Sequence, residues 1–212
     1  MNDLANQIEI LNAELSKQVP QEILTVFQKS IEDLQSQNIE KNSLKVGDKI
    51  PDFCLPNANY EIICSENILK KGKMIVAFYR GSWCPYCNLE LQELQKNLAK
   101  IIAKETALVA ISPQSPDNSL TLSEKHNLQF EVLTDANNIF AKQLGITFKL
   151  QDFVLSSYKS IGINLKDFNK DEENTLPVPA VFLVNEKREI LYNFFDVNYT
   201  NRINIEELLN LL

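Results

Sequence analysis

Histidine and positive charge are both scarce in this sequence. Its 212 residues contain one histidine, and 21 lysines and arginines stand against 28 aspartates and glutamates, which gives a formal net charge of −7. Such a negative balance disfavours nucleic acids and anionic membranes as main partners. The hydrophobic share of 44% and the charged share of 23% are ordinary for a globular protein, so a disordered chain is not expected.

Long apolar runs and a secretory leader are also absent from the sequence. The longest runs, such as Met74-Ile75-Val76-Ala77-Phe78, are far too short to span a bilayer. The first residues, Met1-Asn2-Asp3-Leu4, lack the basic and apolar segments of a signal peptide. We therefore expect an intracellular, cytoplasmic protein that has no membrane partner.

The first forty residues carry two apolar stripes with helical spacing, one before and one after Pro20. Pro20 suits the opening of the second helix. Such stripes are usually packing or dimer surfaces, so we expect residues 1–43 to form a helical extension, with a homodimer through these helices as one outcome. The stripes consist of Leu4, Ile8, Leu11 and Leu15, and of Ile23, Phe27, Ile31 and Leu34.

Residues 44–212 alternate between strand and helix patterns and predict an α/β fold. The alternation implies a parallel sheet core flanked by helices, and a terminal hairpin should supply antiparallel edges. An insertion occupies residues 148–174. Expected strands are 74–79, 106–111, 130–133, 180–184 and 189–195; expected helices follow the first strand through Ile102 and cover 115–127, 136–144 and 203–211; a further hairpin has its turn at 56–59 and its return strand at 60–63.

The chemistry of the sequence is concentrated in Trp83-Cys84-Pro85-Tyr86-Cys87. This segment lies where a buried strand ends and a long helix begins. A helix N-terminus supplies unpaired N–H groups and partial positive charge, and both favour a thiolate over a thiol. Pro85 fits an early helical position and holds the two sulfurs close enough to join. The pattern predicts a redox-active cysteine pair.

The motif has two alternative interpretations besides a redox-active pair: half of a zinc site, or two inert cysteines in the core. Zinc needs four ligands, and Cys54, Cys64 and His126 form no second half-site, so we expect neither metal nor cofactor. His126 is expected at the surface. Structural disulfides are not expected in a reducing compartment. We therefore expect Cys54 and Cys64 to act as small hydrophobic residues, with a resolving or regulatory role as the alternative.

Arg80 is the only arginine before Arg188 and lies four residues before Cys84. A guanidinium at this position would stabilise a thiolate or a developing oxyanion. A surface ion pair is the alternative role for Arg80.

Two segments resemble the thioredoxin superfamily and, within it, the peroxiredoxin branch, the alkyl hydroperoxide reductase and thiol-specific antioxidant group. They are Val46-Gly47-Asp48-Lys49-Ile50-Pro51-Asp52-Phe53 and Phe78-Tyr79-Arg80-Gly81-Ser82-Trp83-Cys84-Pro85-Tyr86-Cys87, the second resembling the subgroup that carries C-x-x-C. The resemblance implies a thioredoxin-like domain over residues 44–212. It also implies that the Val178–Pro179 bond is cis and that Pro179 faces the redox pair.

The sequence departs from the peroxiredoxin pattern P-x-x-x-T-x-x-C. Aligned on Cys87, the pattern puts Arg80 and Cys84 at the proline and threonine positions, and aligned on Cys84 it also lacks the threonine. The later arginine of the family has no clear counterpart near Pro179. The alignment favours Cys87 as the nucleophile. Unpaired N–H groups and solvent access at the edge of the helix instead favour Cys84 as the nucleophile. We therefore predict that Cys84 attacks the substrate and that Cys87 resolves the oxidised Cys84.

The motifs lead to three hypotheses about function. The first is a thiol-dependent peroxidase, in which Cys84 reduces hydrogen peroxide or an organic hydroperoxide and a thioredoxin-type dithiol restores the pair. The second is a dithiol–disulfide oxidoreductase that acts on protein disulfides. The third is a non-enzymatic redox-sensing or scaffolding module that binds partners through the N-terminal helices.

Overall fold

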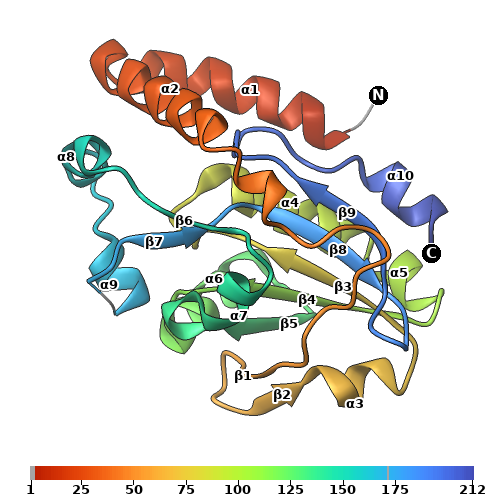
Figure 1. Cartoon of the computed structure of the whole chain (residues 1–212). Coiled ribbons are helices and arrows are strands. Elements are labelled where there is room, and N and C mark those ends of the chain that lie inside the picture. Colours follow the sequence, from red (N-terminus) through yellow and green to blue (C-terminus); the bar gives the residue numbers. More distant parts are fainter. Residues whose placement is uncertain (1–2, 171) are drawn as a thin grey trace.

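A five-stranded mixed sheet lies at the centre of the computed structural model, which describes residues 3–170 and 172–212 (Figure 1). The strand order is β5-β4-β3-β8-β9, and two small two-stranded sheets, β1-β2 and β6-β7, lie outside it. The strands are β1 (Cys54–Pro56), β2 (Ile62–Cys64), β3 (Lys73–Phe78), β4 (Thr106–Ser112), β5 (Glu131–Thr134), β6 (Thr147–Lys149), β7 (Thr175–Pro177), β8 (Ala180–Val184) and β9 (Ile190–Phe195).

Helices cover both faces of this sheet, as expected for an α/β fold (Figure 1). The α-helices are α1 (Asp3–Gln18), α2 (Gln21–Ser36), α3 (Ser65–Leu69), α4 (Pro85–Lys96), α5 (Leu98–Ile102), α6 (Pro116–His126), α7 (Ile139–Gln143), α8 (Asp152–Ser160), α9 (Leu165–Asn169) and α10 (Ile205–Asn210), with 3-10 turns η1 (Ile39–Lys41) and η2 (Ala136–Asn138).

The predicted sheet is confirmed in type and corrected in one detail of its edges. Strands β3, β4 and β5 run parallel, and β8 and β9 form the antiparallel hairpin. That hairpin does not supply both edges. Strand β8 pairs with β3 and is therefore an inner strand, so one edge is β9 and the other is the parallel strand β5.

One expected helix differs in the structure, and the predicted insertion contains helices that the sequence pattern did not indicate. The long helix after the cysteine motif breaks at Asn97, whose side-chain amide donates to the backbone oxygen of Glu93 and leaves α4 and α5 as separate helices. The insertion forms helices α8 and α9 between strands β6 and β7, which pair with each other.

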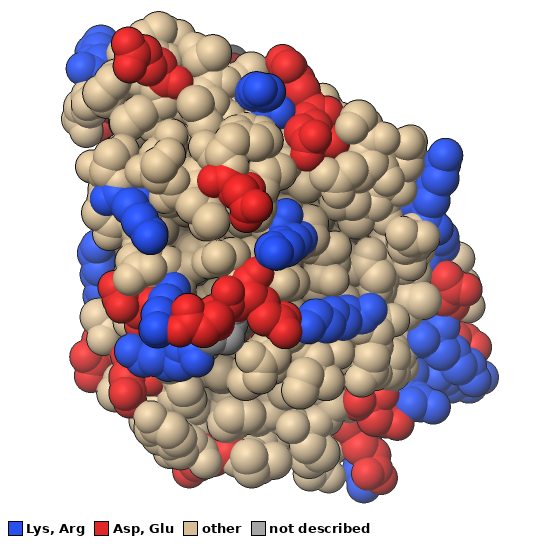
Figure 2. Space-filling view, turned by 60° about the vertical axis from the view of Figure 1, so that its left-hand side comes forward, with Lys and Arg blue, Asp and Glu red and all other residues tan. Residues whose placement is uncertain are grey.

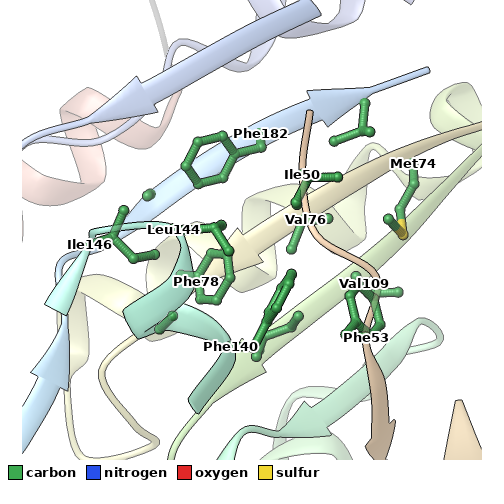
Figure 3. Packing of buried hydrophobic residues seen from close by; sticks show 14 of the residues in the cluster. Ile50, Phe53, Met74, Val76, Phe78, Val109, Phe140, Leu144, Ile146 and Phe182 are labelled. Atoms are coloured by element: carbon green, nitrogen blue, oxygen red, sulfur yellow. The ribbon is translucent and has the colours of Figure 1, made fainter. Parts of the chain in front are cut away.

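Alternating residues of β3 fill the core on opposite faces of the sheet. Met74, Val76 and Phe78 pack into one apolar cluster, while Ile75 and Ala77 pack into another. In the first cluster the ring centroids of Phe78 and Phe140 lie 5.8 Å apart (Figure 3). This burial on both faces explains why β3 is a continuous apolar run.

The N-terminal helices pack against the remainder of the same chain. Helix α1 contacts α4, and α2 contacts α8 (Figure 1). Their predicted stripes face inward: Leu4 is completely buried, and Leu34 belongs to a core cluster with residues of α8. Pro20 occupies the N-cap position of α2, as its place in the sequence predicts.

Cys54 and Cys64 form a disulfide, which corrects their expected role as separate small hydrophobic residues. The antiparallel register of β1 and β2 pairs the two residues directly across the strands. Cysteines at both ends of a predicted hairpin turn were the sequence signal for this bond. Cys54 is exposed and Cys64 is half-buried.

Charged side chains of both signs are interspersed over the face shown in Figure 2, with broad uncharged areas between them. In the part of the chain that the structure describes, no helix combines the length and apolar character needed to cross a membrane.

Candidate active site

The Cys84-x-x-Cys87 segment begins helix α4 directly after strand β3. Cys84 is the N-cap residue and Pro85 is the first helical residue, as predicted. The backbone N–H of Cys84 donates to Gly81 O at 3.1 Å, which folds the loop back on itself. The remaining first-turn amides place partial positive charge beside Cys84.

The loop before Cys84 is held by close packing and by a buried amide. Gly81 has a φ of +149°, and a Cβ there would lie 2.4 Å from Nε1 of Trp83, so this position requires glycine. Gln114, which follows β4, accepts from Ser82 N at 2.7 Å and donates to the Tyr79 hydroxyl at 3.0 Å. These contacts fix residues 79–84, the redox loop, to the sheet.

Both sulfur-bearing residues of the motif are free cysteines with no exposed surface. The expected solvent access of Cys84 is therefore wrong. The physical reason is the surrounding packing: Cys84 and Cys87 share an apolar cluster with Leu91, and Ile8, Leu11 and Leu15 of α1 pack against that cluster. The N-terminal helix covers the position that would otherwise be an open helix edge.

Arg80 is buried beside the cysteine pair and does not form the surface ion pair considered as an alternative. It is 4% exposed, and its guanidinium lies 3.8 Å from the ring centroid of Tyr199 and 4.8 Å from that of Trp83. No carboxylate forms a salt bridge with Arg80 among residues 3–170 and 172–212, and its Nε has no hydrogen-bond partner there. The cation is thus held by aromatic faces beside two thiols.

Arg202 is a second arginine at the site, and sequence reasoning missed it. Its Nη2 donates to Sγ of Cys87 at 3.4 Å, and its Nη1 forms a 3.0 Å salt bridge with Glu90 Oε2. Both of these charged side chains are almost completely buried. The later arginine of the family was expected near Pro179, whereas Arg202 lies in the segment between β9 and α10. In addition, the residue type alone does not show whether an arginine is buried or lies at the surface.

The hydrogen bond between the two cysteines and the nearby charges move the pKa values of the two sulfurs in opposite directions. Burial would raise the pKa of the Cys84 thiol, but a hydrogen bond from Cys87 and the charges of Arg80 and Arg202 outweigh it, so the pKa lies well below the ordinary value. Burial, the hydrogen bond and the negative charge of Cys84 raise the pKa of Cys87 well above its ordinary value. The pair shares one negative charge, held on Cys84.

The direct hydrogen bond from Arg202 goes to Cys87, although the charge is assigned to Cys84. The two statements are compatible, because a neutral thiol sulfur also accepts a hydrogen bond. Burial similarly raises the pKa of Glu90, and the opposing charge of Arg202 limits that rise.

Pro179 lies at the sheet end that carries the redox loop, but its predicted isomer is wrong. Ala180 pairs with Phe78, the last residue of β3, and Val178 shares a core cluster with Trp83. The Val178–Pro179 bond is trans, since no cis peptide bond occurs over the described ranges 3–170 and 172–212. Val178 N donates to Ile146 O at 2.7 Å, which continues the β7 pairing up to β8.

A cleft of about 530 Å³ opens between the redox loop, the N-terminal helices and the end of α8. Arg80, Trp83, Pro85 and Tyr86 line it, so it reaches both sequence neighbours of Cys84. The Tyr86 hydroxyl donates to Asn12 Oδ1 at 2.6 Å, which joins α4 to α1. The three predicted supporting residues of the motif, Trp83, Pro85 and Tyr86, therefore all line the same cleft.

Among the described residues, no group of three or more His, Cys, Asp and Glu side chains could hold a metal ion. His126 ends α6 as expected but is half-buried, and Leu122 of the same helix lies in the cluster around the cysteines. Burial lowers the pKa of His126.

Comparisons with known proteins agree with this architecture. A solved structure, peroxidoxin BcpB of Mycobacterium tuberculosis, has a TM-score of 0.62 and 18% identity over 79% of this chain and 96% of its own. A putative peroxiredoxin of Buchnera aphidicola is 35% identical over 49% of this chain and 65% of its own length. One from Coxiella burnetii is 29% identical over 63% of this chain and 86% of its own.

The match to the Buchnera protein therefore spans slightly less than two thirds of that relative. The sequence model of the AhpC/TSA family matches residues 46–193, which excludes helices α1 and α2 and also Arg202. The predicted thioredoxin-like fold is confirmed, and the chain belongs to the AhpC/TSA family of peroxiredoxins.

Proposed function

We propose that this protein is a thiol-dependent peroxidase whose redox centre is Cys84 and Cys87. The observation that carries the proposal is a free cysteine pair at the start of a helix, flanked by two buried arginines, in a chain of this family. Two cations beside the sulfurs favour a thiolate nucleophile. They also stabilise the negative charge that develops on the leaving oxygen when a peroxide bond breaks.

In the proposed reaction, the Cys84 thiolate attacks the terminal oxygen of a hydroperoxide. An S–O bond forms, the O–O bond breaks, and the leaving alkoxide takes a proton from solvent to become an alcohol, or water when the substrate is hydrogen peroxide. The sulfenic acid on Cys84 then condenses with the Cys87 thiol, which releases water and forms a disulfide. A thioredoxin-type dithiol reduces this disulfide and is itself oxidised.

Burial favours this hypothesis over the dithiol–disulfide oxidoreductase. Attack on a protein disulfide requires the nucleophilic sulfur to reach a bond held on another folded chain, and neither Cys84 nor Cys87 has exposed surface. A hydroperoxide is small, so it needs a far smaller opening than a folded protein does, although neither cysteine lines the cleft itself. The reductant must therefore approach after a local opening around the oxidised pair.

The organisation of the chain is part of the same proposal. We treat residues 1–43 as a helical extension of a peroxiredoxin-type domain, residues 44–212, that acts in the cytoplasm. A homodimer through the extension would have to use its outer faces, where Ile10 is exposed, because the apolar stripes pack on the same chain. Sedimentation or size-exclusion measurements distinguish a monomer from such a dimer.

A coupled assay tests the proposed function. Thioredoxin and its NADPH-dependent reductase are mixed with the protein, and NADPH oxidation is followed after adding hydrogen peroxide or cumene hydroperoxide. We expect peroxide-dependent turnover that Cys84→Ser abolishes and Cys54→Ser retains. Reduction of insulin disulfides at a comparable rate, without peroxide consumption, would instead identify the dithiol–disulfide oxidoreductase.

A further inference from the structure

Helix α1 lies over the apolar cluster that contains both redox sulfurs. Ile8, Leu11 and Leu15 pack against this cluster. Neither Cys84 nor Cys87 has exposed surface. In a mixed disulfide the two Cα atoms lie roughly 4.4–6.8 Å apart, which is closer than the roughly 8–10 Å between the axes of packed helices. The backbone of a dithiol reductant would therefore have to enter the layer of protein that now surrounds the pair.

Few contacts hold α1 in this position. Leu4 is its one buried residue, whereas α4, which carries the cysteines, has six. Two polar contacts join α1 to α4: the 2.6 Å hydrogen bond from Tyr86 to Asn12, and a 3.0 Å ion pair between Lys96 and Asp3. Both side chains of that ion pair are more than half exposed, so the pair adds little stability. An element with few buried side chains opens at a lower free-energy cost than the core does.

The connection between α1 and α2 allows the first helix to move without the second. It consists of Val19 and Pro20. Val19 N donates back to Leu15 O in α1, and Pro20 O accepts from Ile23 N and Leu24 N in α2. Proline has no N–H with which to continue the first helix, and short connections at the ends of elements are where hinge rotations occur. Helix α2 is held more firmly, with three buried residues.

We propose that α1 is a cover, which rotates about Val19 and Pro20 and leaves the redox pair open to the dithiol reductant. This inference rests on the proposed peroxidase function and assigns its reductive step to the open form. A thiolate of the reductant attacks one sulfur of the Cys84–Cys87 disulfide, and its second thiol resolves the mixed disulfide. Two thiols then remain on this protein and one disulfide on the reductant. Helix α1 lies outside the region that matches the family, so the cover is a property of this chain.

The test weakens the docking of α1 and measures access to the redox pair. Leu4→Ala and Leu11→Ala each remove apolar contact beneath α1. Ile10→Ala is the matched control, because Ile10 is 53% exposed on the same helix. Alanine has the highest helix propensity, so none of the replacements weakens the helix itself. All proteins also carry alanine in place of both hairpin cysteines, which leaves the redox pair as the only thiols.

Access is measured with reagents of two sizes. The reduced proteins are alkylated by N-ethylmaleimide or by a maleimide attached to polyethylene glycol, and the oxidised proteins are reduced by dithiothreitol or by thioredoxin. We expect the ratio of rate constants, large reagent over small, to rise about tenfold in Leu4→Ala and Leu11→Ala. Tenfold corresponds to roughly 1.4 kcal/mol of docking free energy, less than a leucine-to-alanine change removes in a core. Ile10→Ala should keep the ratio of the parent protein, and equal ratios in all four proteins would overturn the cover.

Hydrogen exchange of the unsubstituted protein tests the cover without any change to α1. A helix of this length is only marginally stable in water once it leaves its packing surface, so opening exposes its amides to exchange. We expect the amides of α1 to exchange about tenfold faster than those of α4 or more. Equal protection of the two helices would overturn the cover.

The two proposals fail in different ways. Peroxide turnover together with equal ratios of rate constants would overturn the cover and leave the peroxidase function intact. A rise of the alkylation ratio in both docking variants, without peroxide turnover in the parent protein, would support the cover and refute the proposed function.

Discussion

Arg80 and Arg202 place two positive charges beside a buried pair of thiols. Their contacts differ, because Arg202 is paired with Glu90 and Arg80 lies against aromatic rings with no carboxylate partner among the described residues. Replacement of Arg202 would leave a buried carboxylate without its partner, which is strongly destabilising. Replacement of Arg80 leaves no such carboxylate, so Arg80 is the residue on which the electrostatic account is best tested.

We predict that Arg80→Met moves the ionisation of Cys84 to higher pH. The wild-type pKa of Cys84 is depressed, so its thiolate persists to lower pH than that of an ordinary cysteine and is lost as pH falls through the depressed pKa. Without the positive charge of Arg80, protonation of the Cys84 thiolate begins at higher pH. The rate of iodoacetamide alkylation should fall about tenfold at pH 6 and change little at pH 10.

Arg188→Met is the control for this measurement, since Arg188 is a partly exposed arginine paired with Asp52. Its profile of alkylation rate against pH should coincide with the wild-type profile. If Arg80→Met also coincides with the wild type, then Arg80 is no source of thiolate stabilisation, and its role is confined to packing between the rings.

The residue scale is also where prediction from the sequence was least complete. Cys84 and Cys87 stood in one motif, and Arg80 lay close enough in the sequence to be considered beside them, with a surface ion pair as its alternative role. Arg202 lies 115 positions after Cys87, and nothing in its neighbours indicates that the chain returns to the redox loop. The exposure of Cys84 was wrong for a related reason, because the covering helix α1 is more than 60 positions away in the sequence.

At the scale of elements, the local sequence pattern predicted the limits of a strand well where a proline or a polar turn marks them. Strand β8 was predicted with its observed limits, because Pro179 precedes it and a polar turn follows. The trans Val178–Pro179 bond was not predictable from the resemblance. The pairing of β6 with β7 at the two ends of the insertion was not revealed by the sequence pattern either.

The β1-β2 hairpin carries its own prediction. Its disulfide closes a loop with a sequence separation of 10. Loop-closure entropy for a loop of this size corresponds to about 2–3 kcal/mol of stabilisation. Adding dithiothreitol should therefore lower the free energy of unfolding of the oxidised wild type by this amount, and should leave the double variant Cys54→Ala/Cys64→Ala unchanged. Urea unfolding with and without the reductant measures both quantities.

The same double variant should retain peroxidase activity, because Cys54 and Cys64 belong to the hairpin rather than to the cluster around Cys84. A wild-type protein whose unfolding does not respond to dithiothreitol would show that the two cysteines are not joined in solution. A large loss of activity in the double variant would give them the resolving role considered from the sequence.

Over the whole molecule, a family domain and a pair of N-terminal helices enclose one reactive centre. Strand β3 and helix α4 hold the cysteines, the segment after β9 brings Arg202, and α1 covers the apolar cluster around both sulfurs. The alternation of strands and helices was sufficient to predict the sheet. The position of α1 and α2 over the redox loop was not predictable, because an amphipathic stripe does not specify which apolar surface it meets.

The identity of the attacking sulfur tests the central claim most directly. The variants Cys87→Ser and Cys84→Ser are each treated with one equivalent of cumene hydroperoxide in the presence of a sulfenic-acid reagent such as dimedone. Peptide mass spectrometry then locates the adduct. We predict a stoichiometric adduct on Cys84 in Cys87→Ser, and no reaction in Cys84→Ser, because the shared negative charge resides on Cys84. A fast single oxidation of Cys87 in Cys84→Ser, with Cys87→Ser inert, would contradict this account and reverse the roles of the two cysteines.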